Sequence, residues 1–131
     1  MNKFFLIVGA VSGALSVMLG AFGAHGLKDK VNAETLQIFE TAVRYQFYHV
    51  FALLAAGILF QYIPSSSLLW CGRLFIIGTI IFSGSLYALT LTRAAGNNNF
   101  NWLGAITPIG GTCLIAGWIC MSIALIKYGN T

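Results

Sequence analysis

Charge is scarce in this sequence: only 8% of its 131 residues are Asp, Glu, Lys or Arg. Soluble domains carry about 25% charged residues, so the composition excludes an ordinary water-soluble globule. The seven basic residues are scattered between apolar blocks and form no run. This layout is typical of residues that flank membrane spans, and we expect no nucleic-acid partner.

Residues that bind metals or catalyse reactions are also few. The chain has two histidines and three cysteines, with no CxxC pair and no HExxH motif, and no Ser-His-Asp set is evident. We therefore expect no catalytic residues, no metal and no cofactor. The cysteines, Cys71, Cys113 and Cys120, are predicted to be small buried apolar residues. Cys71 and Cys120 could lie at similar depth on neighbouring antiparallel spans.

Long apolar runs fill most of the chain, which is 58% hydrophobic with a mean hydropathy of +0.84. A helix of about 20 residues crosses a bilayer core of about 30 Å. The runs long enough to do so are residues 4–24, 45–63, 68–91 and 102–126. The first exceeds a signal-peptide apolar region of about 7–15 residues, so we expect a retained span. The sequence predicts one all-α integral membrane domain, residues 1–131, with an up-down-up-down bundle of transmembrane helices.

Small residues form a regular stripe in the first span. Gly9, Gly13, Ser16 and Gly20 are spaced four, three and four residues apart, which places them on one helix face. Such a stripe lets another helix approach closely. We expect it to pack either within the bundle or against a second copy of the chain or another membrane protein.

Two interruptions of the helical pattern are expected. Residues 33–44 form an amphipathic lead-in that continues into the second span. The combined helix would exceed the bilayer core, which predicts a bend near Arg44 or a protruding first part. In the fourth span, Thr107-Pro108 and Gly110-Gly111 predict a kink or local loosening.

The basic residues divide between the two membrane sides. The side of the termini carries Lys3, Arg73 and Lys127, and the other carries Lys28, Lys30, Arg44 and Arg93. The larger number on the second side favours termini that lie outside the cell.

Polar residues cluster where the lead-in joins the second span. Glu40, Arg44 and Tyr48 share a helix face, and Glu40 precedes Arg44 at the spacing that favours an ion pair. His49 lies about one turn inside the span, where an ionisable group is a functional candidate. It is expected either to form a hydrogen bond with a hydroxyl of the third span or to serve as a ligand or proton site.

The short third loop brings further hydroxyls to the same membrane side. We predict a polar pocket at one membrane face from these residues: Glu40, Arg44, Tyr48, His49, Ser83, Ser85, Tyr87 and Thr107.

Four blocks of the sequence together resemble one family. They are residues 20–26 (GAFGAHG), 44–49 (RYQFYH), 82–87 (FSGSLY), and 103–111 (LGAITPIGG) with Gly117-Trp118. They resemble the small bacterial membrane proteins of uncharacterised protein family 0382, also called domain of unknown function 423. Eukaryotic transmembrane protein 256 is more distantly similar. The resemblance implies a multi-pass protein of the bacterial cell (inner) membrane, and it supplies no substrate, reaction or site.

Three functions fit these observations. The first is a non-enzymatic bundle that is structural or binds a partner, with membrane lipids around it. The second is a protein that binds or transports an anion, a lipid or another small molecule, with Arg44 as the charge contact. The third is a membrane-embedded enzyme with His49 as general base, which would need a nucleophile or water beside the imidazole.

Overall fold

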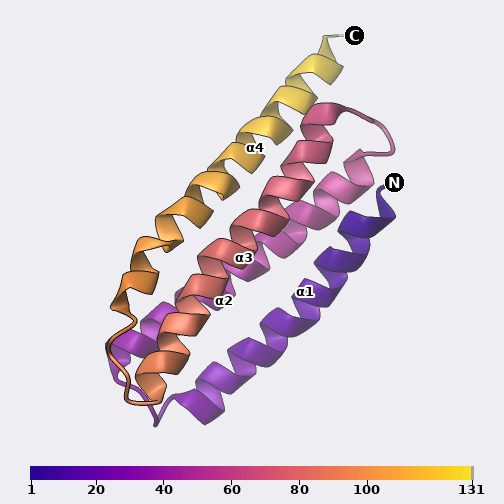
Figure 1. Cartoon of the computed structure of the whole chain (residues 1–131). Helices are drawn as coiled ribbons and strands as arrows, with labels where there is room; N and C mark the ends of the chain where they lie inside the picture. Colours follow the sequence, from indigo (N-terminus) through magenta and orange to yellow (C-terminus); the bar gives the residue numbers. More distant parts are fainter. Residues whose placement is uncertain (131) are drawn as a thin grey trace.

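The computed structural model describes residues 1–130, and within them it is all-helical (Figure 1). The elements are α1 (Lys3–Phe22), the π-helical turn η1 (Gly23–Leu27), α2 (Ala33–Leu59), α3 (Ser66–Ala94), the 3-10 turn η2 (Asn101–Ala105) and α4 (Thr107–Gly129). Four helices are long and apolar enough to cross a membrane. The prediction of an all-α membrane protein with four spans is therefore confirmed.

Each helix runs antiparallel to the next, and both termini lie at one end of the molecule (Figure 1). Helix α1 packs on α2, α2 on α3, and α3 most extensively on α4. Consequently α1 and α4 lie on opposite sides of the central α2–α3 pair. Helices α1 and α3 both pack on α2, and residues of all three helices line the groove described below.

Helix boundaries follow local capping chemistry. The side chain of Asn32 accepts a hydrogen bond from the backbone N–H of Thr35 at the start of α2, and Ser65 caps α3 through the N–H of Leu68. Both are preferred N-cap residues. Helix α2 runs without interruption through Arg44 to Leu59. The amphipathic lead-in and the second span are thus one helix.

The stripe of small residues in α1 faces α2. A Cβ atom added at Gly9 would lie 2.8 Å from Leu54, and one at Gly20 would lie 3.6 Å from Val43. Ser16 is buried and donates its hydroxyl to the carbonyl of Ser12. The stripe therefore packs against α2 of the same chain. Its spacing is accounted for by this contact and does not indicate that a second copy of the chain binds to that face.

Helices α3 and α4 approach each other closely at Gly110. A Cβ atom there would lie 2.4 Å from the backbone nitrogen of Phe82, a distance that only glycine permits. Pro108 lies in the first turn of α4, where its missing N–H removes no helical hydrogen bond. The sequence predicts a kink or local loosening here; the structure has the 3-10 turn η2 followed by α4, which begins at Thr107, one residue before this proline.

One apolar cluster of buried side chains lies toward the end that holds the termini. Phe5 of α1 and Phe75 of α3 are 1% exposed and belong to one apolar cluster with Cys71. Cys120 packs against that cluster, and both thiols are free. The two cysteines thus meet on neighbouring antiparallel spans as apolar residues.

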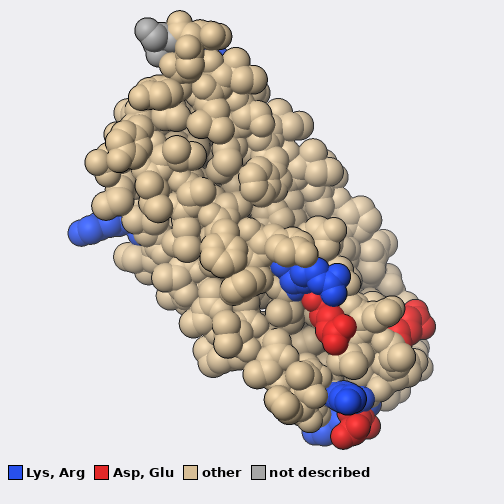
Figure 2. All heavy atoms as spheres, turned by 180° about the vertical axis from the view of Figure 1, so that it is seen from behind, with Lys and Arg blue, Asp and Glu red and all other residues tan. Residues whose placement is uncertain are grey.

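Charged side chains gather toward the other end. On the face seen in Figure 2, the acidic side chains lie in the lower half beside basic ones, and the surface above is largely uncharged. With 27 residues, α2 is about 40 Å long, about 10 Å more than a bilayer core. The first part of α2 is therefore positioned to extend into the headgroup region.

Candidate functional site

A groove of about 470 Å³ lies between α1 and α3, with α2 at its base; we call it the α1–α3 groove. Apolar residues such as Val11 and Ile80 form its walls. No Asp, Glu, Lys or Arg is among its lining residues. Its polar members are Ser12, Gln46, His49, Thr79, Ser83 and Tyr87. Such a site combines a hydrocarbon-like wall with a few hydrogen-bonding groups, as ligand pockets typically do.

Gln46 is the centre of the polar base. Its amide nitrogen donates to both the carbonyl and the hydroxyl oxygen of Ser12, at 3.2 Å each. Its amide oxygen accepts a hydrogen bond of 2.6 Å from the Tyr87 hydroxyl. The side chain is 7% exposed, so these bonds replace the water that it loses. One residue thereby connects α1, α2 and α3.

His49 is held by hydrogen bonds at both ring nitrogens. Nδ1 lies 2.7 Å from the carbonyl oxygen of Tyr45, which can only accept, so Nδ1 carries the hydrogen. Nε2 is then an acceptor, and the indole nitrogen of Trp118 donates to it over 3.1 Å. The imidazole is therefore the neutral Nδ1–H tautomer. No lone pair of the ring is left for a general base or a metal.

The partner of His49 differs from the one that the sequence suggested. The expected hydroxyls were Ser83, Ser85 and Tyr87 on α3, whereas the observed donor lies on α4. Ser83 instead donates to the carbonyl of Ala42 at 2.7 Å. His49 therefore connects α2 to α4 and leaves the hydroxyls of α3 to other partners.

Ser85 and Thr107 form a separate contact between α3 and α4. Their hydroxyl oxygens are 2.7 Å apart. The single hydrogen of Ser85 is directed to the carbonyl of Phe82, so Thr107 donates to Ser85. Neither residue lines the α1–α3 groove.

Glu40, Arg44 and Tyr48 lie on an exposed face of α2. Glu40 and Arg44 line a second groove, of about 300 Å³, between α2 and α1. Within residues 1–130 the ion pair of the structure joins Arg93 and Glu34, and Glu40 forms none with Arg44. The eight residues of the predicted pocket therefore lie in three places: the α1–α3 groove, the Ser85–Thr107 contact, and the exposed face of α2.

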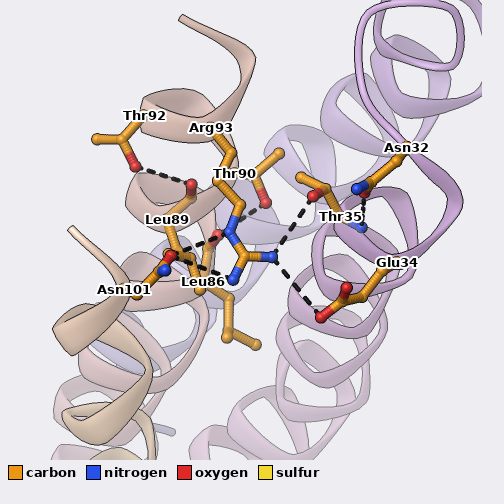
Figure 3. Close-up of polar contacts among 9 residues, drawn as sticks. All are labelled: Asn32, Glu34, Thr35, Leu86, Leu89, Thr90, Thr92, Arg93 and Asn101. Carbon is orange, nitrogen blue, oxygen red and sulfur yellow. Dashed lines mark hydrogen bonds and ion pairs between the residues drawn. The ribbon is translucent and has the colours of Figure 1, made fainter. Parts of the chain in front are cut away.

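A polar cap, formed by Glu34, Thr35, Arg93 and Asn101, closes the end that carries the loops (Figure 3). The guanidinium of Arg93 donates to Asn101 Oδ1 from Nε at 3.3 Å and from Nη2 at 3.2 Å. Its Nη1 donates to Thr35 at 3.5 Å and lies 3.9 Å from Glu34. Arg93 thus connects the end of α3 to the start of α2 and to η2.

Sequence reasoning missed Ser12, Gln46 and Trp118 as site residues, and treated Arg93 only as a flanking charge. For Gln46 a signal was present, because a primary amide in an apolar span requires partners. Trp118 has no such signal, since it lies 69 positions from His49 in the chain. In the part of the chain that the structure describes, every buried polar side-chain atom has a hydrogen-bond partner.

Comparison with known proteins identifies the family. The family described as "Protein of unknown function (DUF423)" matches residues 19–111. The chain belongs to this family. A UPF0382 membrane protein of Staphylococcus epidermidis is 44% identical, with 98% of this chain and 99% of the relative covered. The UPF0382 membrane protein YwdK of Bacillus subtilis is 41% identical, with 96% and 98% covered. No solved structure matches the chain.

Membership of the DUF423 family agrees with the resemblance seen in the sequence blocks. The relatives are named as membrane proteins, and four helices of this chain can cross a bilayer. The protein is therefore a multi-pass protein of the bacterial cell membrane. The family name carries no activity, so function must be argued from the grooves and the polar contacts.

Proposed function

We propose that this DUF423 protein is a non-enzymatic helical bundle that binds an uncharged amphiphile carrying a hydroxyl group in the α1–α3 groove. The supporting observation is the combination of apolar walls with a polar base that holds no formal charge. A charged ligand would meet no opposite charge there. An alkyl or isoprenoid chain would replace lipid against the walls at little cost.

The remaining hydrogen-bonding capacity of the base indicates the polar group of the ligand. The Gln46 amide oxygen accepts one hydrogen bond and can accept a second, and the Tyr87 oxygen only donates and can still accept. The Ser12 hydroxyl accepts from Gln46 and keeps its hydrogen. An alcohol both donates and accepts, so it can bond to this mixture of groups.

Gly84 supports an open groove at the wall of α3. It lines the groove, and a Cβ atom added there would have no neighbour within 4 Å. A larger side chain at this position can therefore occupy the ligand space without displacing the helices. Gly129, at the end of α4, has the same free surroundings and lies outside the groove.

Photo-crosslinking tests the proposal. Purified protein in detergent is labelled with farnesol that carries a diazirine, and the labelled peptides are identified by mass spectrometry. We expect labelling on α1 and α3 that excess farnesol suppresses. Farnesyl methyl ether, which cannot donate a hydrogen bond, should compete less well.

Variants show whether the groove is the site. Gly84→Leu should remove the labelling that farnesol suppresses, and Gly129→Leu should retain it. Labelling that is equal in both variants, or that farnesol does not suppress, would contradict the proposal.

A purely structural role is the second candidate, because the buried polar side chains bond to one another. Ser83 and His49 each join two helices, and Gln46 joins three. On this alternative, substitutions at these residues change stability, while Gly84→Leu, which breaks no hydrogen bond, has no effect on any cellular phenotype of a deletion strain.

A further inference from the structure

The groove between α1 and α2 has a different chemistry from the α1–α3 groove. It measures about 300 Å³, and Gly20, Val43 and Phe47 contribute to its apolar walls. Glu40 and Arg44 also line it. One positive and one negative side chain thus lie beside the apolar walls of this groove, on the lipid-facing surface.

These two charges are both free to bind a ligand. Glu40 precedes Arg44 by four residues, the spacing and order that favour an ion pair on a helix. They nevertheless do not pair, and the carboxylate and guanidinium have no protein partner within residues 1–130. Both side chains are exposed, so a ligand can reach both of them.

The depth of Arg44 places it near the membrane boundary. Gly20 packs against Val43, the neighbour of Arg44. Gly20 follows Lys3 by 17 positions, or about 26 Å along α1, so it lies near the far limit of a bilayer core of about 30 Å. Glu40 is one turn nearer the loop end of α2, about 6 Å further toward water.

We infer that this groove binds an aminophospholipid, with Arg44 holding the phosphate and Glu40 holding the ammonium group. In such a lipid the acyl chains lie inward of the phosphate, and a short linker carries the amine on the outer side. Phe47, Arg44 and Glu40 all line the groove and follow one another in this order toward the loop end of α2, which matches the order of acyl chain, phosphate and amine. Arginine binds phosphate oxygens through two N–H groups, and a carboxylate accepts hydrogen bonds from an ammonium.

The acidic residue gives the site its selectivity. A phospholipid without an amine offers no positive charge to Glu40. The carboxylate of Glu40 would then repel the nearby phosphate, and this repulsion would weaken binding of that lipid. A free phosphate ion would be repelled by Glu40 in the same way, and it has no acyl chain to pack in the apolar groove. The site therefore distinguishes ethanolamine-type headgroups from glycerol-type headgroups of the same chain length.

Native mass spectrometry of protein reconstituted with equimolar phosphatidylethanolamine and phosphatidylglycerol tests this inference. We expect the wild-type protein to retain phosphatidylethanolamine about tenfold more than phosphatidylglycerol, the effect of about one charge-assisted hydrogen bond. Arg44→Gln should lose both lipids. Glu40→Gln should keep lipid bound and lose the preference between them.

Two controls make the result specific to the order of charges. Arg73→Gln removes an exposed arginine from the other end of the bundle and should leave the lipid preference unchanged. The double variant Glu40→Arg with Arg44→Glu keeps the net charge and reverses the order, and it should lose the preference. A preference that persists in the reversed variant, or is absent from the wild type, would overturn the inference.

The site is independent of the function proposed for the α1–α3 groove. Gly84→Leu should leave the lipid preference unchanged, because Gly84 does not line the α1–α2 groove. Conversely, Arg44→Gln should leave the farnesol labelling intact. Failure of one proposal can therefore be told apart from failure of the other.

Discussion

The indole nitrogen of Trp118 donates a hydrogen bond to Nε2 of the buried His49 over 3.1 Å, which connects α4 to α2. The two rings also meet edge to face, with centroids 6.0 Å apart. Helix α4 otherwise packs mainly on α3. This contact therefore fixes the rotation of α4 relative to the helix that carries most of the polar residues.

Replacing Trp118 with Phe should weaken this connection. The ring contact remains, but Nε2 of His49 loses its donor in an apolar environment, so we expect a loss of about 1 kcal/mol in the free energy of unfolding. Unfolding in detergent by added sodium dodecyl sulfate measures the change. Trp102→Phe, at an exposed position in η2, is the matched control and should have little effect. Equal losses from both variants would show that the hydrogen bond contributes nothing.

Adjacent glycines in α4 should respond oppositely to the same substitution. Gly110→Ala places a methyl group against the Phe82 backbone at 2.4 Å, whereas Gly111→Ala meets the Phe82 ring at an ordinary 3.7 Å. Overpacking against backbone costs about 1–3 kcal/mol. Alanine also gains about 1 kcal/mol of helix propensity over glycine, so Gly111→Ala should be neutral or stabilising. The same unfolding assay separates them, and a Gly110→Ala protein as stable as Gly111→Ala would mean that the helices are further apart.

Gln46 and Tyr87 should be energetically coupled. The hydroxyl of Tyr87 reaches the Gln46 amide oxygen at 2.6 Å, so Tyr87→Phe and Gln46→Leu each break the same bond. A double-mutant cycle of unfolding free energies should give a coupling of about 1 kcal/mol. A cycle between Tyr87 and Ser85, whose hydroxyl bonds elsewhere, serves as the control. A coupling near zero between Gln46 and Tyr87 would show that the hydrogen bond between them contributes nothing to stability, and would contradict the central position given to Gln46.

The helices could be predicted from the sequence because their signals are local. A run of apolar residues long enough to cross a bilayer is sufficient for a span. The starts of α2 and α3 are also local features, because Asn32 and Ser65 each cap a backbone N–H only three residues further along the chain. The structure places Pro108 in the first turn of α4. Proline fits both a kink and a first turn, and only the 3-10 turn before it decides between them.

The polar pocket could not be predicted because it depends on the rotation of each helix about its axis. The spacing of Glu40, Arg44 and Tyr48 correctly places them on one face, yet that face is exposed. Gln46 and His49 turn toward the interior and find partners on α1 and α4. The sequence does not show which neighbouring helix each face contacts, so it predicts one site from residues that share only their depth in the membrane.

Arg93 should hold the loop end of the bundle together through neutral partners more than through its ion pair. Glu34 is 75% exposed and 3.9 Å away, and exposed pairs contribute about 0–1 kcal/mol. Asn101 receives two hydrogen bonds from the guanidinium (Figure 3). Amide hydrogen exchange should therefore rise across residues 97–105 in Arg93→Met and in Asn101→Ala, and stay unchanged in Glu34→Gln. If Glu34→Gln alone reproduced the effect of Arg93→Met, the ion pair would be the main contact that orders this loop.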